Sequence, residues 1–194
     1  MSKITVDTVE PATGTSLTLG ASGDTISVPS GATLESAGQP VTNQPAFEAY
    51  KDATTGSLAD NTSTKVAFNV EVFDTNSAYD HSTNHRFTVP SGKAGKYHVY
   101  TAVYMFTAGG STANDLQLGE LVIKKNGSST VAMIERNTNG YGNSITMQAA
   151  VTLDLSAADY IEVWSKLDTA GVTWSIGGTT FQRTTFGAFR LIGV

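Results

Sequence analysis

The sequence contains no cysteine, and only 15% of its 194 residues are charged. Without cysteine the chain has no disulfide framework, no thiolate nucleophile and no cysteine-ligated zinc. The charged fraction is well below the roughly 25% of average proteins. The net charge is −5 and lysine and arginine form no cluster. The composition therefore excludes the basic face on which nucleic-acid binding depends.

Long apolar runs are also missing. No stretch reaches the roughly 20 residues that a membrane-spanning helix needs. The opening MSKITVDTVEP lacks the apolar centre of a signal peptide. We therefore expect a protein that is made in the cytoplasm and is not inserted into a membrane. Since 40% of the residues are hydrophobic, the chain has enough apolar material for one main domain with an appendage.

Catalytic signatures are scarce. There is no Gly-x-Ser-x-Gly elbow, phosphate-binding loop or dinucleotide fingerprint. Carboxylates such as Asp154, Asp159 and Glu162 fall in or beside predicted strands and turns. Glycoside hydrolysis needs two carboxylates at a defined separation beside a cleft, and neither can be read from these positions. We do not expect an enzyme.

The histidines do not predict a metal site. His81 and His85 stand four residues apart near Asp74 and Asp80, but the segment is predicted to be a loop. Zinc needs three or four converging ligands, and no third ligand is evident. His98 lies in a predicted strand, where we expect it to point outward or to lie at a subunit interface.

The chain changes character near residue 44. Residues 1–44 are rich in glycine, threonine and serine, and their apolar residues come in alternating pairs, Leu17 with Leu19 and Ile26 with Val28. Such short strands bury too little apolar area to offset the entropy of ordering them. One interpretation is a flexible tail. The alternation favours the other, an extended, β-rich anchoring arm in which several chains bury these pairs together.

Residues 45–194 predict an all-β domain. GKYHVYTAVYMF, at residues 95–106, is rich in the aromatic and β-branched residues that strands prefer. Asn126-Gly127 joins two apolar runs and predicts a tight hairpin. No segment keeps a helical period. Eight or more short strands with frequent turns are typical of a β-sandwich or jelly roll.

Several segments of this domain, in the right order, resemble the complement globular-head domains. QPAFEAYKD is similar to their opening Pro-Ala-Phe-x-Ala strand, and VIKKNG to their Lys-Asn-Gly hairpin. TTFGAFRL is similar to their closing strand. The blocks between these also match, in KVAFNVEVFDTNSAYDHSTNHRFTVPSGKAGKYHVYTAVYM and AAVTLDLSAADYIEVWS.

Three positions depart from that pattern. Ala158 stands where a glycine is usual, Gly187-Ala188 replaces Ser-Gly, and Arg190 replaces an apolar residue. If the last strand is covered on both faces, Arg190 must find an acid or a carbonyl oxygen, or reach solvent. The small Gly187 and Ala188 would let neighbouring backbones approach closely.

The complement globular-head family shares its architecture with tumour necrosis factor. The resemblance to this family implies a ten-stranded jelly-roll β-sandwich that forms a homotrimer and acts by binding. The first and last strands would lie near the threefold axis. Some family members bind calcium there, so Asp115 or Asp74 is the candidate ligand for a structural calcium ion, and no other cofactor is expected. The interface residues expected on this basis are Phe47, Tyr50, Phe186, Phe189, Arg190 and Ile192.

Recognition on a rigid β scaffold is usually carried by loops. The candidate loops are TAGGSTANDLQ, NTNGYGNS and LDTAGVTW, and Tyr141 stands between two glycines. Trp164 and Trp174 lie in predicted strands, which favours a core or interface position. The residues expected to bind a partner are Asn114, Asp115, Asn139, Tyr141, Asn143 and Asp168.

The N-terminal segment carries a second resemblance. Residues 1–34 resemble the leader of fibre and other structural proteins of tailed bacteriophages. This implies a trimeric virion protein, a fibre or decoration protein, whose residues 1–44 bind other virion proteins. Its head, residues 45–194, would bind a host-surface glycan or protein with the avidity of three sites. The alternative is a free, secreted binding module of the same fold, lectin-like or protein-binding; a polysaccharide-degrading enzyme is less favoured.

Overall fold

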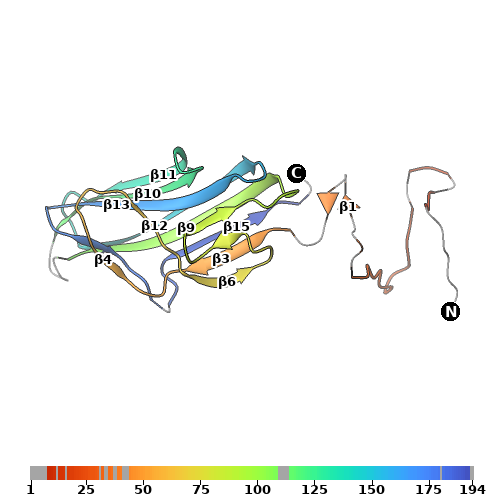
Figure 1. The fold of residues 1–194 in the computed structure, drawn as a ribbon, viewed down its shortest axis with the longest axis horizontal. Coiled ribbons are helices and arrows are strands. Elements are labelled where there is room, and N and C mark those ends of the chain that lie inside the picture. Colours follow the sequence, from red (N-terminus) through yellow and green to blue (C-terminus); the bar gives the residue numbers. More distant parts are fainter. Residues whose placement is uncertain are drawn as a thin grey trace.

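The computed structural model shows two parts, an extended N-terminal segment and a β-sandwich head (Figure 1). No helix occurs in the part of the chain that it describes, and so none that could cross a membrane. The described residues are 8–11, 13–15, 17–30, 32, 35–36, 39–40, 44–108, 114–179 and 181–192.

The longest strand of the head buries every second side chain, as the alternation in the sequence requires. β9 (Gly95–Thr107) does so from Tyr97 to its end. The other strands are β3 (Ala46–Tyr50), β4 (Thr55–Leu58), β5 (Thr64–Lys65), β6 (Val70–Asp74), β7 (Tyr79–Asp80), β8 (Arg86–Thr88), β10 (Leu116–Lys125), β11 (Ser129–Asn137), β12 (Ser144–Leu155), β13 (Tyr160–Thr169), β14 (Trp174–Ile176) and β15 (Thr185–Arg190).

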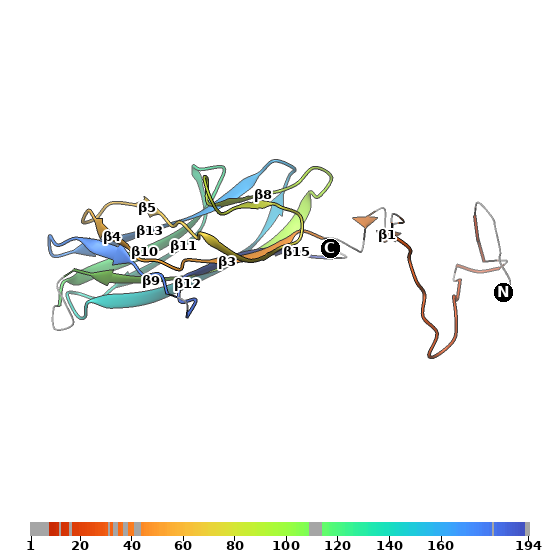
Figure 2. The same cartoon turned by 60° about the horizontal axis from the view of Figure 1, so that its bottom comes forward.

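These strands form two antiparallel sheets that face each other (Figure 2). In the seven-stranded sheet, β9 pairs along one side with β12 over its whole length. On its other side β9 pairs with β15 and then with β14, and β15 pairs with β3. The six-stranded sheet has the order β11-β10-β13-β8-β7, with β5 paired to β13. The sandwich is confirmed, with more strands than the ten expected because short pairings extend both sheets.

The core between the sheets is centred on stacked aromatic rings. Phe47 lies parallel to Tyr79 at 4.6 Å between ring centroids and to Phe87 at 5.1 Å, and Phe186 meets Phe47 edge-on at 5.0 Å. Trp174 is also fully buried. Aromatic pairs in these geometries add to the free energy of burial, so this cluster ties the first strand of the head to the last.

Phe47 and Phe186 were expected at a subunit interface, whereas within one chain they pack into the core between the two sheets. Both side chains are 0% exposed within the single chain. They lie on the faces of β3 and β15 that point toward the second sheet, so neither is available to another subunit. Half-buried Tyr50 on β3 and 42% exposed Phe189 on β15, each three residues further along, point away from the core.

Two turns of the head contain residues with left-handed φ angles. Asn126 and Gly127 join β10 to β11 with φ angles of 53° and 75°, the type I′ geometry that this pair favours. Between β12 and β13 the chain crosses from one sheet to the other at residues 156–159. Ala158, where glycine was expected, takes a left-handed φ of 69° there.

Arg190 joins the beginning of the head to its last strand through hydrogen bonds. The guanidinium of Arg190 donates to the side-chain oxygen of Gln44 at 2.6 Å and to the carbonyl oxygen of Ala94 at 2.7 Å. Gly95 makes room for it, because a β-carbon there would lie 2.9 Å from the Arg190 Nε. Arg190 therefore has the carbonyl partner that its position near the end of a covered strand requires.

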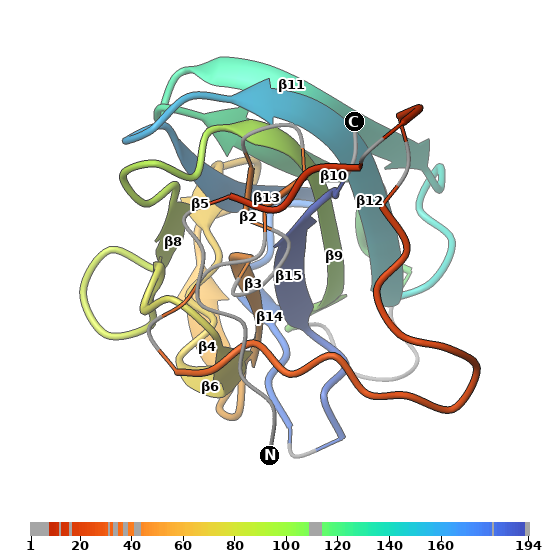
Figure 3. The same cartoon turned by 90° about the vertical axis from the view of Figure 1, so that its right-hand side faces the viewer.

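The N-terminal segment extends away from the end of the head that holds Arg190 (Figures 1 and 3). Its described residues between 8 and 32 form no strand, and Leu19 and Ile26 are 60% and 61% exposed. The strands expected at residues 17–19 and 26–28 are thus not formed within one chain. The one pairing in this segment joins β1 (Glu35–Ser36) to β2 (Gln39–Pro40). Residues 1–7 lie outside the described residues.

Candidate functional site

The outer face of the seven-stranded sheet carries a row of aromatic side chains that point away from the core. Its outward side chains on β9 are alternate residues of the aromatic run, and β15 adds Phe189. The rings of His98 and Phe189 lie 5.4 Å apart and those of Tyr104 and Phe106 5.6 Å apart. We call this surface the aromatic face; it consists of His98, Tyr100, Tyr104, Phe106 and Phe189.

Few charged groups touch this face, and one of them is the guanidinium of Arg183, which lies 5.1 Å from the ring centroid of Tyr104. From His98 to Phe106 on β9 and from Ser144 to Thr152 on β12, the outward side chains carry no carboxylate, ammonium or guanidinium group. The carboxylate of Glu48 on β3 accepts a hydrogen bond from the hydroxyl of Tyr100 at 2.8 Å. Burial and this hydrogen bond to Glu48 raise the pKa of Tyr100 well above its usual range, so the hydroxyl stays a donor.

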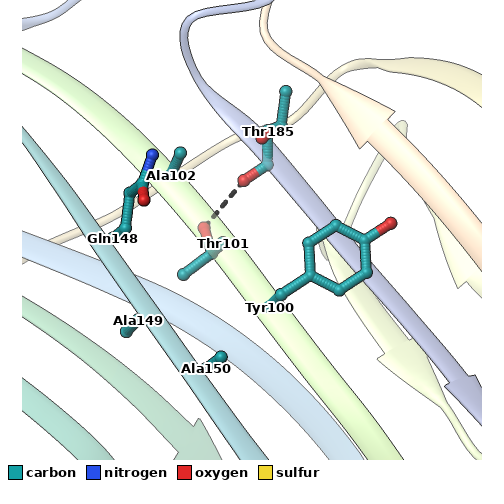
Figure 4. Close-up of a pocket in the computed structure, with 7 residues that line it drawn as sticks. All are labelled: Tyr100, Thr101, Ala102, Gln148, Ala149, Ala150 and Thr185. Carbon is teal, nitrogen blue, oxygen red and sulfur yellow. Dashed lines mark hydrogen bonds between the residues drawn. The ribbon is translucent and has the colours of Figure 1, made fainter.

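A shallow depression of about 390 Å³ opens in the aromatic face beside Tyr100 (Figure 4). Its floor is formed by small side chains, including Ala102 on β9 and Ala150 on β12, and Gln148 stands at its side. The Thr101 hydroxyl donates to the carbonyl oxygen of Thr185 at 2.8 Å beneath it. The depression offers van der Waals contact and one amide group, which suits an apolar side chain better than a charged ligand.

The outer face of the six-stranded sheet has the opposite character. Lys65 pairs with the nearly buried Glu162 at 2.5 Å, and Lys166 pairs with Glu120 at 3.1 Å. Trp164 lies between two ammonium groups, with Lys124 4.3 Å from its ring centroid. The outer face of the six-stranded sheet is thus rich in paired charges, whereas the middle of the seven-stranded sheet carries a row of half-exposed rings.

The loops expected to bind a partner meet at the end of the head opposite the N-terminal segment. The amide of Gly142 donates to the side-chain oxygen of Asn114 at 3.0 Å, and the amide of Ala170 donates to the carbonyl oxygen of Asp115 at 2.9 Å. Tyr141 stands above them, 78% exposed. The fold therefore brings together loops separated by more than fifty residues.

Three further expected residues lie at the same end. Asn139 is exposed in the turn before Tyr141, and the carbonyl oxygen of Asn143 accepts from the amide of Thr107 at 2.8 Å. Asp168 lies on β13 opposite Leu118 and is half-buried. Residues 109–113 of the first candidate loop lie outside the described residues.

The groups considered for metal binding have other roles. The Nδ1 of His81 lies 2.8 Å from a carboxylate oxygen of Glu71. The carboxylates of Asp74 and Asp80 accept hydrogen bonds from backbone amides of their own loops. Within the described residues no group of three or more histidine, aspartate or glutamate side chains is placed to hold a metal ion.

Tyr50 and the last residues of the chain remain candidates for an interface. Tyr50 is half-buried on β3, opposite Thr185. Ile192 is 59% exposed beyond β15. Tyr100, Tyr104 and Phe106 were not among the residues expected at an interface, although the alternation in GKYHVYTAVYMF contained the signal. If Tyr97 and Val99 point inward, the alternate residues of this strand point outward.

Comparisons with known proteins identify the architecture. The sequence matches no protein-family model and no characterised protein sequence. The globular domain of zebrafish complement 1qA aligns with a TM-score of 0.51 and 15% identity, over 76% of this chain and 98% of that domain. Murine APRIL gives 0.54 and 14% over 76% and 99%. Eiger TNF from S. frugiperda gives 0.52 and 13% over 78% and 95%.

The head therefore has a jelly-roll fold like that of these complement and TNF domains. At these identities the likeness concerns the fold alone. It agrees with the motifs that suggested this fold from the sequence.

Proposed function

We propose that the chain is a homotrimeric binding protein of a virion, a fibre or decoration protein. The aromatic face joins three copies, residues 1–44 anchor the trimer to the particle, and the loops around Tyr141 contact a host-surface glycan or protein. The aromatic face is the observation that supports this proposal most directly.

Burial of apolar surface favours assembly of the head. Contiguous exposed apolar patches of this kind mark interaction surfaces in soluble proteins. In a single chain Phe189 is 42% exposed and the other four rings are half-buried, so part of each ring remains in water. A homotrimer in which each copy buries its aromatic face removes the rings from water and leaves the charged sheet outside. The resemblance to complement globular heads supports the same arrangement.

The loops and the arm fit this assembly. The candidate loops share one end of the head and the arm leaves from the other, so three copies side by side would present three loop clusters away from the anchor. Three weak sites on one rigid trimer bind far more tightly than one. The exposed apolar pairs of the arm, such as Leu17 with Leu19, would be buried against other copies or virion proteins.

Light scattering tests the trimer. We expect three times the chain mass at micromolar concentration for the unaltered protein. Phe189→Glu places a charge in the aromatic face and should give a folded monomer, because an unpaired buried charge costs several kcal/mol. Met133→Glu is the matched control, since Met133 is similarly exposed but lies on the six-stranded sheet. A monomeric unaltered protein would contradict the proposal.

Mass spectrometry of purified particles tests the virion role. The chain should be present in intact particles and a labelled micrograph should place it on their surface. A trimer that is absent from particles would favour the free binding module instead. Incubation of the trimer with host polysaccharide should release no new reducing ends; their release would show an enzyme.

A further inference from the structure

The head contains two Asn-Gly turns with the same backbone geometry and different side-chain contacts. Asn126 and Gly127 have φ angles of 53° and 75°, and Asn139 and Gly140 have 52° and 80°. Both pairs are central residues of type I′ turns. Any difference in their chemistry therefore comes from what holds the asparagine side chain.

Asn126 is held at both ends of its side-chain amide. Its Nδ2 donates to Asp159 at 2.8 Å, and its Oδ1 accepts from the backbone amide of Tyr160 at 2.9 Å. The following residue, Gly127, is also screened, because the Tyr160 hydroxyl lies 2.9 Å from where a β-carbon would be. The amide carbon of Asn126 cannot turn toward the next backbone nitrogen unless both hydrogen bonds break.

The side-chain amide of Asn139 has no such restraint, although Gly140 is also packed, with the Gln117 Nε2 3.2 Å from where its β-carbon would be. Its backbone amide donates to the side chain of Asn137 at 2.8 Å, but within the described residues no hydrogen bond holds its side-chain amide. It is exposed. The amide of Gly140 donates to the carbonyl oxygen of Leu116 at 3.0 Å, and this single bond must open before the nitrogen can react. Turns at the ends of sheets open locally at low cost.

We propose that Asn139 is a site of spontaneous deamidation and that Asn126 is protected by the fold. The backbone nitrogen of Gly140 attacks Cγ of Asn139, a nitrogen–carbon bond forms, and the Cγ–Nδ2 bond breaks. Nδ2 leaves as ammonia with the proton from the Gly140 amide. Water then opens the cyclic imide at either carbonyl, giving aspartate or isoaspartate. Glycine permits the attack because it has no side chain to block it.

The product changes the loop that carries Tyr141. Either product makes the chain one unit more negative, and isoaspartate also lengthens the backbone by one carbon inside a turn of fixed length. The chemical step does not depend on the proposed function; its effect on partner binding does. An aged protein would thus differ from a fresh one at the end of the head that holds the candidate loops.

Mass spectrometry of the full-length chain after incubation at mildly alkaline pH tests the proposal. Trypsin separates the two turns, because residues 126–136 and 137–166 are bounded by lysine or arginine. We expect the modified fraction at Asn139 to exceed that at Asn126 by about tenfold or more, since a net hydrogen bond changes an equilibrium by roughly that factor. Fragment masses assign the site within each peptide.

Two controls separate the fold from the local sequence. In denaturant the deamidation rates of Asn126 and Asn139 should become similar, because the hydrogen bonds of the Asn126 side chain are lost. Asn139→Ser should leave residues 137–166 unmodified in the folded chain. Equal rates at Asn126 and Asn139 in the folded protein, or no modification at Asn139, would overturn the proposal.

Discussion

The ring of Tyr100 lies directly across Gly187, so closely that a β-carbon on residue 187 would stand 2.3 Å from its Cζ. Tyr100 belongs to β9 and Gly187 to β15, and the Tyr100 hydroxyl reaches Glu48 on β3. One side chain thus links three neighbouring strands across the outer face of the sheet. The missing side chain at residue 187 is what allows Tyr100 to lie flat on that face.

Gly187→Ala should therefore destabilise the head. The new methyl group displaces Tyr100 and breaks its hydrogen bond to Glu48, and overpacking of this kind costs about 1–3 kcal/mol. Chemical denaturation measures the change. Gly56→Ala is the control, since a β-carbon there meets the Ser175 hydroxyl at 3.4 Å, an ordinary contact. Equal stability of the Gly187→Ala variant and the unaltered protein would show that Tyr100 can move freely.

Ala158→Gly should stabilise the head. An L-residue in the left-handed region costs roughly 1–2 kcal/mol, and part of this gain is offset by the greater chain entropy of glycine. We expect a net increase of up to about 1 kcal/mol in the free energy of unfolding. Ala157→Gly, in the same turn but without a positive φ, should lower stability slightly. Thermal unfolding of both variants measures these changes in stability, and a lower melting temperature for Ala158→Gly would contradict the prediction.

The carboxylate of Asp159 should make stability fall in acid. Lys125 at 2.7 Å, then Asn126 and the amide of Ser156, lower its pKa from 3.8 to about 2. Because the folded pKa is below the unfolded one, the stabilisation is complete above about pH 4 and is lost as the pH falls toward 2. The loss should be about 1–2 kcal/mol. Denaturation curves between pH 5 and 2 should show a weaker pH dependence for Asp159→Asn, whereas an equally steep loss in the variant would contradict this assignment.

The variants Phe47→Ala and Phe189→Ala should distinguish a residue of the core from a residue of the trimer interface. Phe47 is buried between the sheets, so its truncation should cost about 3–5 kcal/mol at every protein concentration. Phe189 is 42% exposed in the single chain, so its truncation should change the unfolding of the monomer little and weaken the trimer. Denaturation at low and high protein concentration distinguishes the two effects. If the loss of stability in Phe47→Ala depended on protein concentration, Phe47 would be an interface residue after all.

Local chemistry explains which features could be predicted. The Asn126-Gly127 hairpin and the strand over residues 95–106 depend on backbone preferences and alternation that neighbouring residues carry themselves. The roles of Phe47 and Phe186 could not be derived in this way. The alternation of a strand predicts that Phe186 and Phe189 point to opposite faces of the sheet. It does not predict which of these faces packs against the second sheet.

The sequence by itself determined the all-β class, the turns, the lack of cysteine chemistry and the motifs of a complement-like head, because each is set by composition or by residues near one another. Tertiary structure decided which side of each strand is buried, since that depends on where the second sheet lies. It also placed Tyr100 over Gly187, brought Asn114 to the turn of Tyr141, and tied down Asn126 while leaving Asn139 free. Each of these contacts joins segments distant in the chain, and only their packing brings them within reach.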